Sequence, residues 1–267
     1  MTPPTPVQER VLVLCRAIPE ESTKYGTVVC CAGLTDSGEF RRLYPVPFHP
    51  FRRGGGIPFH KKQWITASLQ PPEARDKRAE SRKIDMKSIV AGVKVDDDEV
   101  RGRIQPVLSK SIGEIKSKGA TLGFIRPFLI DYEFEIVKDP TKPDQLKFDP
   151  DGQLAAGTTV RLPQESKYKF KCRDPSSCEC AYRPHDMVIK DWEVNELFRN
   201  VSEKTPREYI AAKMRNRMFD SMLPRDLYFM MGTHSVYGSW LLVSILYLRK
   251  PDSKGSSLPL DDCLDGP

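Results

Sequence analysis

The sequence predicts an α+β protein. Its N-terminal part is expected to form a curved sheet or a small β-barrel, and its C-terminal part to carry a Cys/His metal site with helices and a β-hairpin. One observation behind this fold class is a series of short, β-branched, apolar segments in the first seventy positions. Another is a cluster of three cysteines and one histidine within fourteen residues, followed by clear helix signals.

Four segments of the N-terminal part have the composition of strands. A turn signal at residues 36–38 separates the second from the third, as in a hairpin. Four prolines and three consecutive glycines break regular structure between residues 45 and 60, which predicts a long loop. Short strands around such a loop suit a small barrel. The expected strands are residues 11–17, 27–34, 39–44 and 63–70.

The middle of the chain alternates between helix and strand patterns. Residues 99–118 repeat apolar side chains at helical spacing, and Pro106 predicts two helices or one broken helix. Residues 130–137 alternate apolar and acidic side chains, as an antiparallel strand with one wet face does. Further strands are expected at residues 121–126, 168–172, 226–231 and 240–248.

Helix signals are strongest after residue 190. Asp191 can cap a helix over residues 192–201, and residues 205–208 combine a capping box with proline at the first helical position of a second helix. In that second helix an apolar stripe recurs at intervals of four, which predicts core packing. The stripe is Ile210, Met214, Met218 and Met222.

An exposed excursion rich in Pro, Asp, Gly and Lys at residues 138–158 divides the chain. We therefore expect a β-rich domain over residues 1–138 with a basic aromatic loop. A domain with the metal site, helices and hairpin is expected over residues 159–250, and a flexible tail over residues 251–267.

The Cys/His cluster is the clearest chemical signal. Soft sulfur and borderline nitrogen ligands suit tetrahedral Zn²⁺. A metal also gives a physical reason for this loop to be ordered, because the loop contains little apolar material to bury. The expected zinc ligands are Cys172, Cys178, Cys180 and His185.

Three other interpretations of this cluster stay open. The same thiolates could hold an iron-sulfur cluster, with His185 or a distant cysteine as the fourth ligand. The cysteines could be incidental and exposed, or Cys178 and Cys180 could form a redox pair, which a missing thioredoxin-like pattern makes less favourable.

Acidic side chains near the cluster raise the alternative of a metal-dependent, nuclease-like enzyme. Asp186, Asp191 and Glu193 follow the cluster directly, and His234 lies in a later loop. Asp191 and Glu193 have a simpler interpretation, because acidic residues stabilise the positive end of the helix that they begin. The sequence does not decide whether the protein is an enzyme, and a regulatory interaction module is a third alternative.

A basic segment interleaved with aromatic residues predicts contact with single-stranded or structured nucleic acid. Cations meet phosphates and aromatic rings stack on unpaired bases. The alternative is a solvated loop whose rings fold inward onto the sheet. The expected nucleic-acid-binding residues are Arg41, Arg42, Tyr44, Arg52, Arg53, Lys61, Lys62 and Trp64.

The apolar runs, the first residues and the cysteine spacing together predict the cellular compartment. The longest strongly apolar run, residues 240–248, is far shorter than the roughly 20 residues of a membrane-spanning helix. The first ten residues lack the pattern of a secretory signal. Seven unevenly spaced cysteines are not a secreted disulfide framework, so Cys15, Cys30 and Cys31 are interpreted as small buried residues. We expect a cytoplasmic protein without a membrane partner; no pattern fixes its oligomeric state.

Four segments resemble a family of bacterial proteins that is itself uncharacterised. They read R-L-Y-P-V-P-F at residues 42–48, K-F-K-C at residues 169–172, H-D-M at residues 185–187 and D-W-E at residues 191–193. The resemblance spans most of the chain and implies no established activity. The function expected from the residues is that of a zinc-containing nucleic-acid-binding protein.

Overall fold

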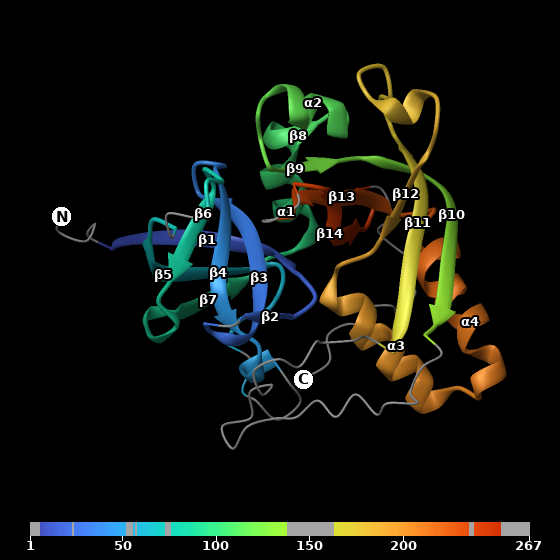
Figure 1. The fold of residues 1–267 in the computed structure, drawn as a ribbon, viewed down its shortest axis with the longest axis horizontal. Helices are drawn as coiled ribbons and strands as arrows, with labels where there is room; N and C mark the ends of the chain where they lie inside the picture. Colours follow the sequence, from blue (N-terminus) through green and yellow to red (C-terminus); the bar gives the residue numbers. More distant parts are fainter. Residues whose placement is uncertain are drawn as a thin grey trace. The chain divides into compact units, whose positions relative to one another are not determined.

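The computed structural model describes residues 6–22, 24–51, 56, 58–72, 76–137, 163–234 and 238–251 (Figure 1). Contacts divide this part of the chain between Arg103 and Ile104 into two compact units. The linker expected at residues 138–158 and nearly all of the expected tail lie outside the described residues. The domain boundaries expected there stay predictions.

The first unit contains a closed five-stranded barrel, whose strands Figure 1 labels. The strands pair in the order β1-β3-β4-β6-β5, and β5 also pairs with β1, so the sheet closes on itself. The pairing of β4 with β6 is parallel, and the other barrel pairings are antiparallel. The strands are β1 (Val7–Arg16), β3 (Gly26–Thr35), β4 (Phe40–Pro47), β5 (Gln63–Gln70) and β6 (Ser81–Ile84).

The barrel strands bury apolar side chains on both faces of the sheet. Leu12, Leu43 and Ile65 come from three different strands and are each at most 1% exposed. Burial of such side chains is the main favourable contribution to folding. The expected small N-terminal barrel is confirmed.

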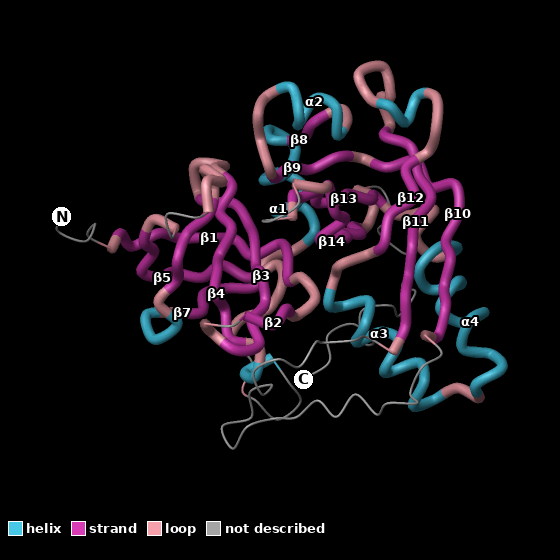
Figure 2. The backbone as a smooth tube through the Cα atoms, in the orientation of Figure 1, coloured by secondary structure: helices cyan, strands magenta, loops and turns pink. Residues whose placement is uncertain are grey.

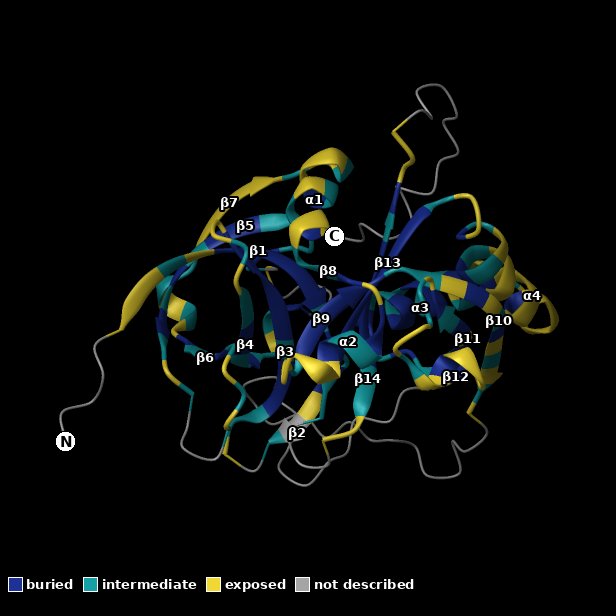
Figure 3. Cartoon of the chain, turned by 90° about the horizontal axis from the view of Figure 1, so that it is seen from above, coloured by how far each residue is buried: buried dark blue, intermediate teal, exposed yellow. Residues whose placement is uncertain are grey.

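Short elements flank the barrel strands. β2 (Glu20–Ser22) pairs with β3, and β7 (Val90–Lys94) pairs with β5 and is exposed along its length (Figure 3). The short helices η1 (His49–Phe51) and η2 (Met86–Ser88) lie in the connections, and α1 (Asp97–Ile104) follows β7.

The second unit has two sheets and three α-helices among its described residues (Figure 2). One sheet pairs β10 (Pro127–Ile136), β11 (Gln164–Cys172) and β12 (His185–Val188), in that order. The other has the order β14 (Trp240–Leu248), β13 (Asp226–Thr233), β9 (Leu122–Ile125) and β8 (Leu108–Ser109). The helical segments are η3 (Gln105–Val107), α2 (Ile112–Ser117), η4 (Glu179–Ala181), α3 (Trp192–Lys204), α4 (Arg207–Arg215) and the π-helical η5 (Asn216–Asp220).

Several predictions about this unit are confirmed. The helical pattern of residues 99–118 divides at Pro106 into α1 and α2, and β13 pairs with β14 as the expected antiparallel hairpin. The apolar stripe of Ile210, Met214, Met218 and Met222 is packed, because each residue is at most 5% exposed.

Two local predictions are wrong. Thr205 is the C-cap of α3, and α4 begins after Pro206 without a side-chain cap, so the expected capping box does not form. Ile130 is 38% exposed because a bulge between Leu129 and Asp131 shifts the strand register and turns Leu129 inward. A simple alternation of apolar and acidic residues cannot reveal such a bulge.

No helix in the described ranges is long and apolar enough to cross a membrane.

Candidate metal centre

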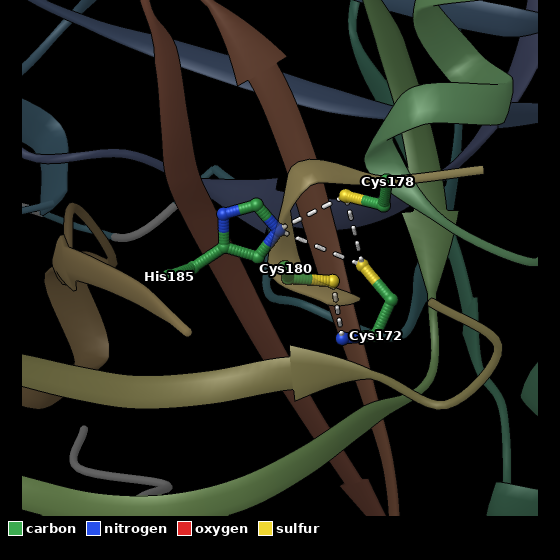
Figure 4. A group of neighbouring side chains, drawn as sticks. All are labelled: Cys172, Cys178, Cys180 and His185. Atoms are coloured by element: carbon green, nitrogen blue, oxygen red, sulfur yellow. Dashed lines mark hydrogen bonds between the residues drawn. The ribbon is translucent and has the colours of Figure 1, made fainter. Parts of the chain in front are cut away.

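Four side chains converge where β11 ends and β12 begins (Figure 4). Cys172 is the last residue of β11, Cys178 lies in the following loop, Cys180 is in η4, and His185 is the first residue of β12. One ligand atom from each of the four lies within 4.8 Å of the others. These are the four residues that the sequence pattern singled out.

The distances among three of the ligand atoms are close to the edges of a tetrahedron around one ion. With a zinc–sulfur distance of about 2.3 Å and a zinc–nitrogen distance of about 2.0 Å, two sulfurs lie roughly 3.8 Å apart and a sulfur and a nitrogen roughly 3.5 Å apart. Cys172 Sγ lies 3.9 Å from Cys178 Sγ and 3.8 Å from His185 Nε2, and Cys178 Sγ lies 3.3 Å from the same nitrogen. This group could hold a metal ion.

The strand pairing fixes the histidine. β11 and β12 are antiparallel, and His185 pairs with Phe170, two positions before Cys172. Alternation along β11 puts Phe170 and Cys172 on the same buried face, and cross-strand pairing brings the imidazole to that face. The imidazole packs against the Phe170 ring with 5.1 Å between the ring centroids. The loop returns Cys180 to the end of β11, where its sulfur accepts a 3.3 Å hydrogen bond from the Cys172 N–H.

A second segment, far away in the sequence, supports the sulfur atoms. The backbone N–H groups of Ile112 and Gly113, at the start of α2, donate hydrogen bonds to Cys172 and Cys178 respectively. The hydroxyl groups of Ser111 and Ser177, 66 positions apart in the chain, lie 2.9 Å from each other. Donors of this kind stabilise thiolates and orient the ligands of a metal.

Gly113 permits this close approach. A Cβ atom at position 113 would lie 1.6 Å from the backbone oxygen of Ser177 and 3.2 Å from the Cα atom of Cys178. No side chain fits between α2 and the cysteine loop, so only glycine allows the two backbones to meet there.

Burial shifts the pKa values of these four side chains and so affects their protonation. Burial raises the pKa of the Cys172 and Cys180 thiols and lowers the pKa of His185, which favours a neutral imidazole. Burial would also raise the pKa of Cys178, but backbone hydrogen bonds from Cys180 and Gly113 contribute to lowering it. A metal bound here would compete with protons on the two thiols of raised pKa.

The residues considered for catalysis do not join this group in the described part of the chain. Asp191 is 2% exposed and caps α3 by accepting a 3.1 Å hydrogen bond from the Glu193 N–H. Its other oxygen accepts a 2.8 Å hydrogen bond from the Ile245 N–H, so the cap also ties α3 to β14. The interpretation of Asp191 as a helix cap is confirmed. Asp186 is exposed on β12. His234 directly follows β13 and is the last residue of the described range 163–234.

The residues expected to bind nucleic acid have varied surroundings. Arg41 donates to Glu9 at 2.5 Å, Arg42 is 3% exposed and bonds Glu80 at 3.1 Å, and Lys62 bonds Asp97 at 2.8 Å. These three cations each have a carboxylate partner.

Trp64 is 1% exposed and donates from Nε1 to Glu99 at 2.9 Å. The guanidinium groups of Arg10 and Arg103 lie 4.2 Å and 5.1 Å from its ring centroid. This ring therefore offers no open face for a base. Tyr44 and Lys61 are partly exposed, and Arg52 and Arg53 lie outside the described residues.

Sequence reasoning missed the residues of α2 that meet the cysteine loop. Ser111, Ile112 and Gly113 belong to a segment that was recognised only as part of a broken helix. Their one sequence signal is a glycine at the second position of a short helix, where glycine is unfavourable without a packing reason.

These features define the class of the protein, which is a two-unit α+β protein with a closed N-terminal barrel and a C-terminal Cys₃His group. Residues 110–261 match the family described as a domain of unknown function, DUF8757, and the chain belongs to this family. Residues 7–110 match a second domain of unknown function, DUF8758. The two matches meet close to the division between the units at Arg103.

Comparison with curated proteins finds no match. Comparison with solved structures finds a chain from "Structure and Conformational Change of a Replication Protein A Heterotrimer Bound to ssDNA". It is 8% identical, with 93% of this chain and 67% of that chain covered and a TM-score of 0.26. A TM-score this low does not show a shared fold. The domain matches are consistent with an uncharacterised family, while the bacterial origin and shared motifs stay predictions.

Proposed function

We propose that this chain is a zinc-containing protein that binds nucleic acid. The observation that carries the zinc assignment is the convergence of four donors, of which Cys172, Cys178 and His185 have close to tetrahedral spacing and Cys180 lies within 4.8 Å of them. A multi-iron cluster is less favoured, because its ligands spread around several metal atoms, whereas all four donors here lie within 4.8 Å of one another.

The zinc site is of the structural kind. Structural sites use four protein ligands, whereas catalytic sites keep one position for water or substrate. Cys172, Cys180 and His185 are each at most 6% exposed, so the site also has little access to solvent. None of the six cysteines of the described residues forms a disulfide, which suits a reducing compartment such as the cytoplasm.

The barrel supports nucleic-acid binding by its architecture and charge. A five-stranded Greek-key barrel is the architecture of the OB fold, which binds oligonucleotides or oligosaccharides across its second and third strands and adjoining loops. The corresponding strands here are β3 and β4. Residues 1–103 contain eighteen Lys and Arg against thirteen Asp and Glu, whereas residues 104–267 contain twenty-four against twenty-three. The excess positive charge favours an anionic ligand.

A pair of tyrosines marks a place for bases on these strands. Tyr44 of β4 and Tyr25, just before β3, are partly exposed and pack edge to face with 6.4 Å between the ring centroids. The exposed Lys24 lies 4.9 Å from the Tyr25 ring centroid. Aromatic rings beside a cation are the combination that stacks on bases and meets phosphates. Tyr44 is therefore the residue of the expected binding set on which this proposal depends.

Metal analysis of purified protein tests the first half of the proposal. One zinc per chain is expected, with no visible absorption from iron. Iron at that stoichiometry, or no metal at all in protein prepared without oxygen, would overturn the zinc assignment.

Fluorescence anisotropy with labelled single-stranded RNA and DNA at two salt concentrations tests the second half. Binding must weaken as salt rises, because phosphate contacts release counterions. Tyr44→Ala is expected to weaken binding about tenfold, from the loss of one stacked base at about 1–3 kcal/mol. Tyr209→Ala, at an exposed tyrosine of α4, is the matched control and is expected to bind as the unaltered protein does. Absence of salt-dependent binding would leave a protein-interaction module.

A further inference from the structure

The loop that carries the cysteines also carries an exposed aromatic side chain that the metal site does not use. Tyr182 follows η4, two positions after Cys180, and is 95% exposed. A largely buried cluster thus lies next to a ring that is almost wholly in water. An exposed ring marks an interaction site when further exposed apolar surface adjoins it.

A second exposed ring lies near this loop. Phe128 of β10 is 65% exposed and pairs with Lys171 of β11, so both side chains project from the same face of the sheet. Lys171 Nζ donates a 3.2 Å hydrogen bond to the backbone oxygen of Ala181, the residue before Tyr182. Lys171 therefore connects Phe128, its partner in the sheet, to the residue before Tyr182.

Two exposed arginines flank the same loop. Arg173 follows Cys172 directly, and Arg183 follows Tyr182. Of the nearby carboxylates, Glu179 lies 3.7 Å from Lys116 Nζ, whereas Asp174 keeps its charge because its partners are the neutral N–H and hydroxyl of Ser176. The three cations Lys171, Arg173 and Arg183 outnumber Asp174, so the remaining charge near Tyr182 is mainly positive.

We infer that Phe128, Lys171, Arg173, Tyr182 and Arg183, here called the knuckle surface, bind single-stranded nucleic acid in addition to the barrel. The rings stack on unpaired bases and the cations meet the phosphates between them. Bases of a duplex already stack on each other, so a surface built on aromatic rings favours a single strand. This inference rests on the proposed nucleic-acid-binding function and adds a separate site to it.

The knuckle surface depends on the zinc ligands for its shape. Arg173 and Tyr182 are one and two positions from ligands of the proposed zinc, and the loop between them has few apolar residues of its own. Loss of the metal is therefore expected to remove this surface and to leave the barrel contact, which uses other residues.

Tyr182→Ala tests the stacking contact. Anisotropy with a fluorescein-labelled oligouridine is expected to show about tenfold weaker binding, and a labelled duplex of matched length is expected to show no change. Tyr209→Ala is the matched control, since Tyr209 is also an exposed tyrosine, 61% exposed, on a different element. Unchanged zinc content and melting temperature establish that Tyr182→Ala is folded.

Arg173→Gln combined with Arg183→Gln tests the phosphate contacts. The slope of log affinity against log salt is expected to become shallower by about 1.4, because each phosphate contact to a single strand contributes about 0.7. Lys213→Gln, at an exposed position of α4, is expected to leave the slope unchanged.

The outcomes separate this inference from the function on which it rests. If Tyr44→Ala weakens binding and Tyr182→Ala does not, the knuckle surface is overturned and the barrel assignment stands. The reverse result supports the knuckle surface and overturns the barrel assignment. If the unaltered protein binds no oligonucleotide, both are overturned.

Discussion

The barrel and the cysteine loop acquire their order in different ways. The barrel closes through backbone pairing of five strands, and these strands bury apolar side chains such as Leu12 and Ile65 on the two faces of the sheet. The loop between β11 and β12 has turns, one short helix and two exposed serines, and the side chains that meet inside it are the cysteines and the histidine. Apolar burial accounts for the order of the first region, whereas the proposed zinc would order the second.

This difference predicts where each region is vulnerable. The barrel is expected to tolerate chelators and to lose stability when its apolar interior is reduced. The cysteine loop is expected to respond to chelators, to loss of a sulfur ligand and to any side chain placed between the loop and α2. Surface substitutions elsewhere are expected to change little.

The largest effect is expected from Cys172→Ser. The substitution removes a buried thiolate from the four donors, and structural zinc sites contribute roughly 10 kcal/mol or more of apparent binding free energy. We expect zinc content to fall below one per chain and the melting temperature to fall by at least ~10 °C. Metal analysis and calorimetry measure the two quantities.

Cys30→Ser is the matched control for that substitution. Cys30 is a half-buried cysteine of the barrel strand β3 and lies outside the ligand group. Its replacement is expected to leave zinc content unchanged. Equal zinc content in both variants would contradict the role of Cys172 as a ligand.

The next largest effect is expected from Gly113→Ala. The new methyl group would overlap the Ser177 oxygen, so α2 must move away and the hydrogen bonds from Ile112 and Gly113 to the sulfurs must lengthen. Overpacking of this kind costs about 1–3 kcal/mol. Zinc retention in a chelator competition should fall together with thermal stability.

Gly102→Ala in α1 is the control for Gly113→Ala. A Cβ atom at position 102 meets nothing within 4 Å, and alanine is favoured over glycine inside a helix by about 1 kcal/mol. The two substitutions are chemically identical and are expected to have opposite signs. A destabilised Gly102→Ala, or an unaffected Gly113→Ala, would contradict the geometry described here.

The contrast between the two regions also explains what the sequence could predict. Local patterns identified β5 at residues 63–70 and β14 at residues 240–248 with correct bounds, because each is an apolar run between breakers. The four candidate ligands came from residue type and spacing alone, and the structure brings them together. Both kinds of signal lie within a short stretch of chain.

Features that depend on distant partners were not predictable. β6 has four residues, Ser81–Ile84, in a segment dominated by charge, yet its parallel pairing with β4 closes the barrel. Trp64 was expected in a binding loop, but its burial depends on Glu99, Arg10 and Arg103, which come from other elements. A sequence pattern shows that a ring is apolar, but it does not show which distant residues will cover that ring.

A smaller effect is expected from Asp191→Ala. The substitution removes the cap of α3 and leaves the buried N–H of Ile245 without its acceptor, which costs about 1–3 kcal/mol. Asp191→Asn keeps an acceptor and is expected to lose less. Zinc content is expected to stay unchanged in both, because Asp191 lies outside the ligand group. Loss of zinc in Asp191→Asn would revive the interpretation of this carboxylate as part of a catalytic metal site.

The smallest effect concerns the connection that leads into β6, and its pH dependence appears only in acid. Burial would raise the pKa of Asp76, but hydrogen bonds from the Arg78 guanidinium and backbone outweigh burial and lower this pKa from 3.8 to about 2. The folded state therefore holds fewer protons than the unfolded state between these two values, so the contribution of Asp76 is complete above pH 3.8 and is lost as the pH falls toward 2.

Asp76→Asn is expected to be less stable than the unaltered protein at neutral pH by about 1 kcal/mol or less, since the pair is partly exposed. The difference in unfolding free energy, measured by urea titration, should shrink in that acid window. A difference that stays constant down to pH 2 would show that Arg78 stabilises this connection through packing and not through the charge of Asp76.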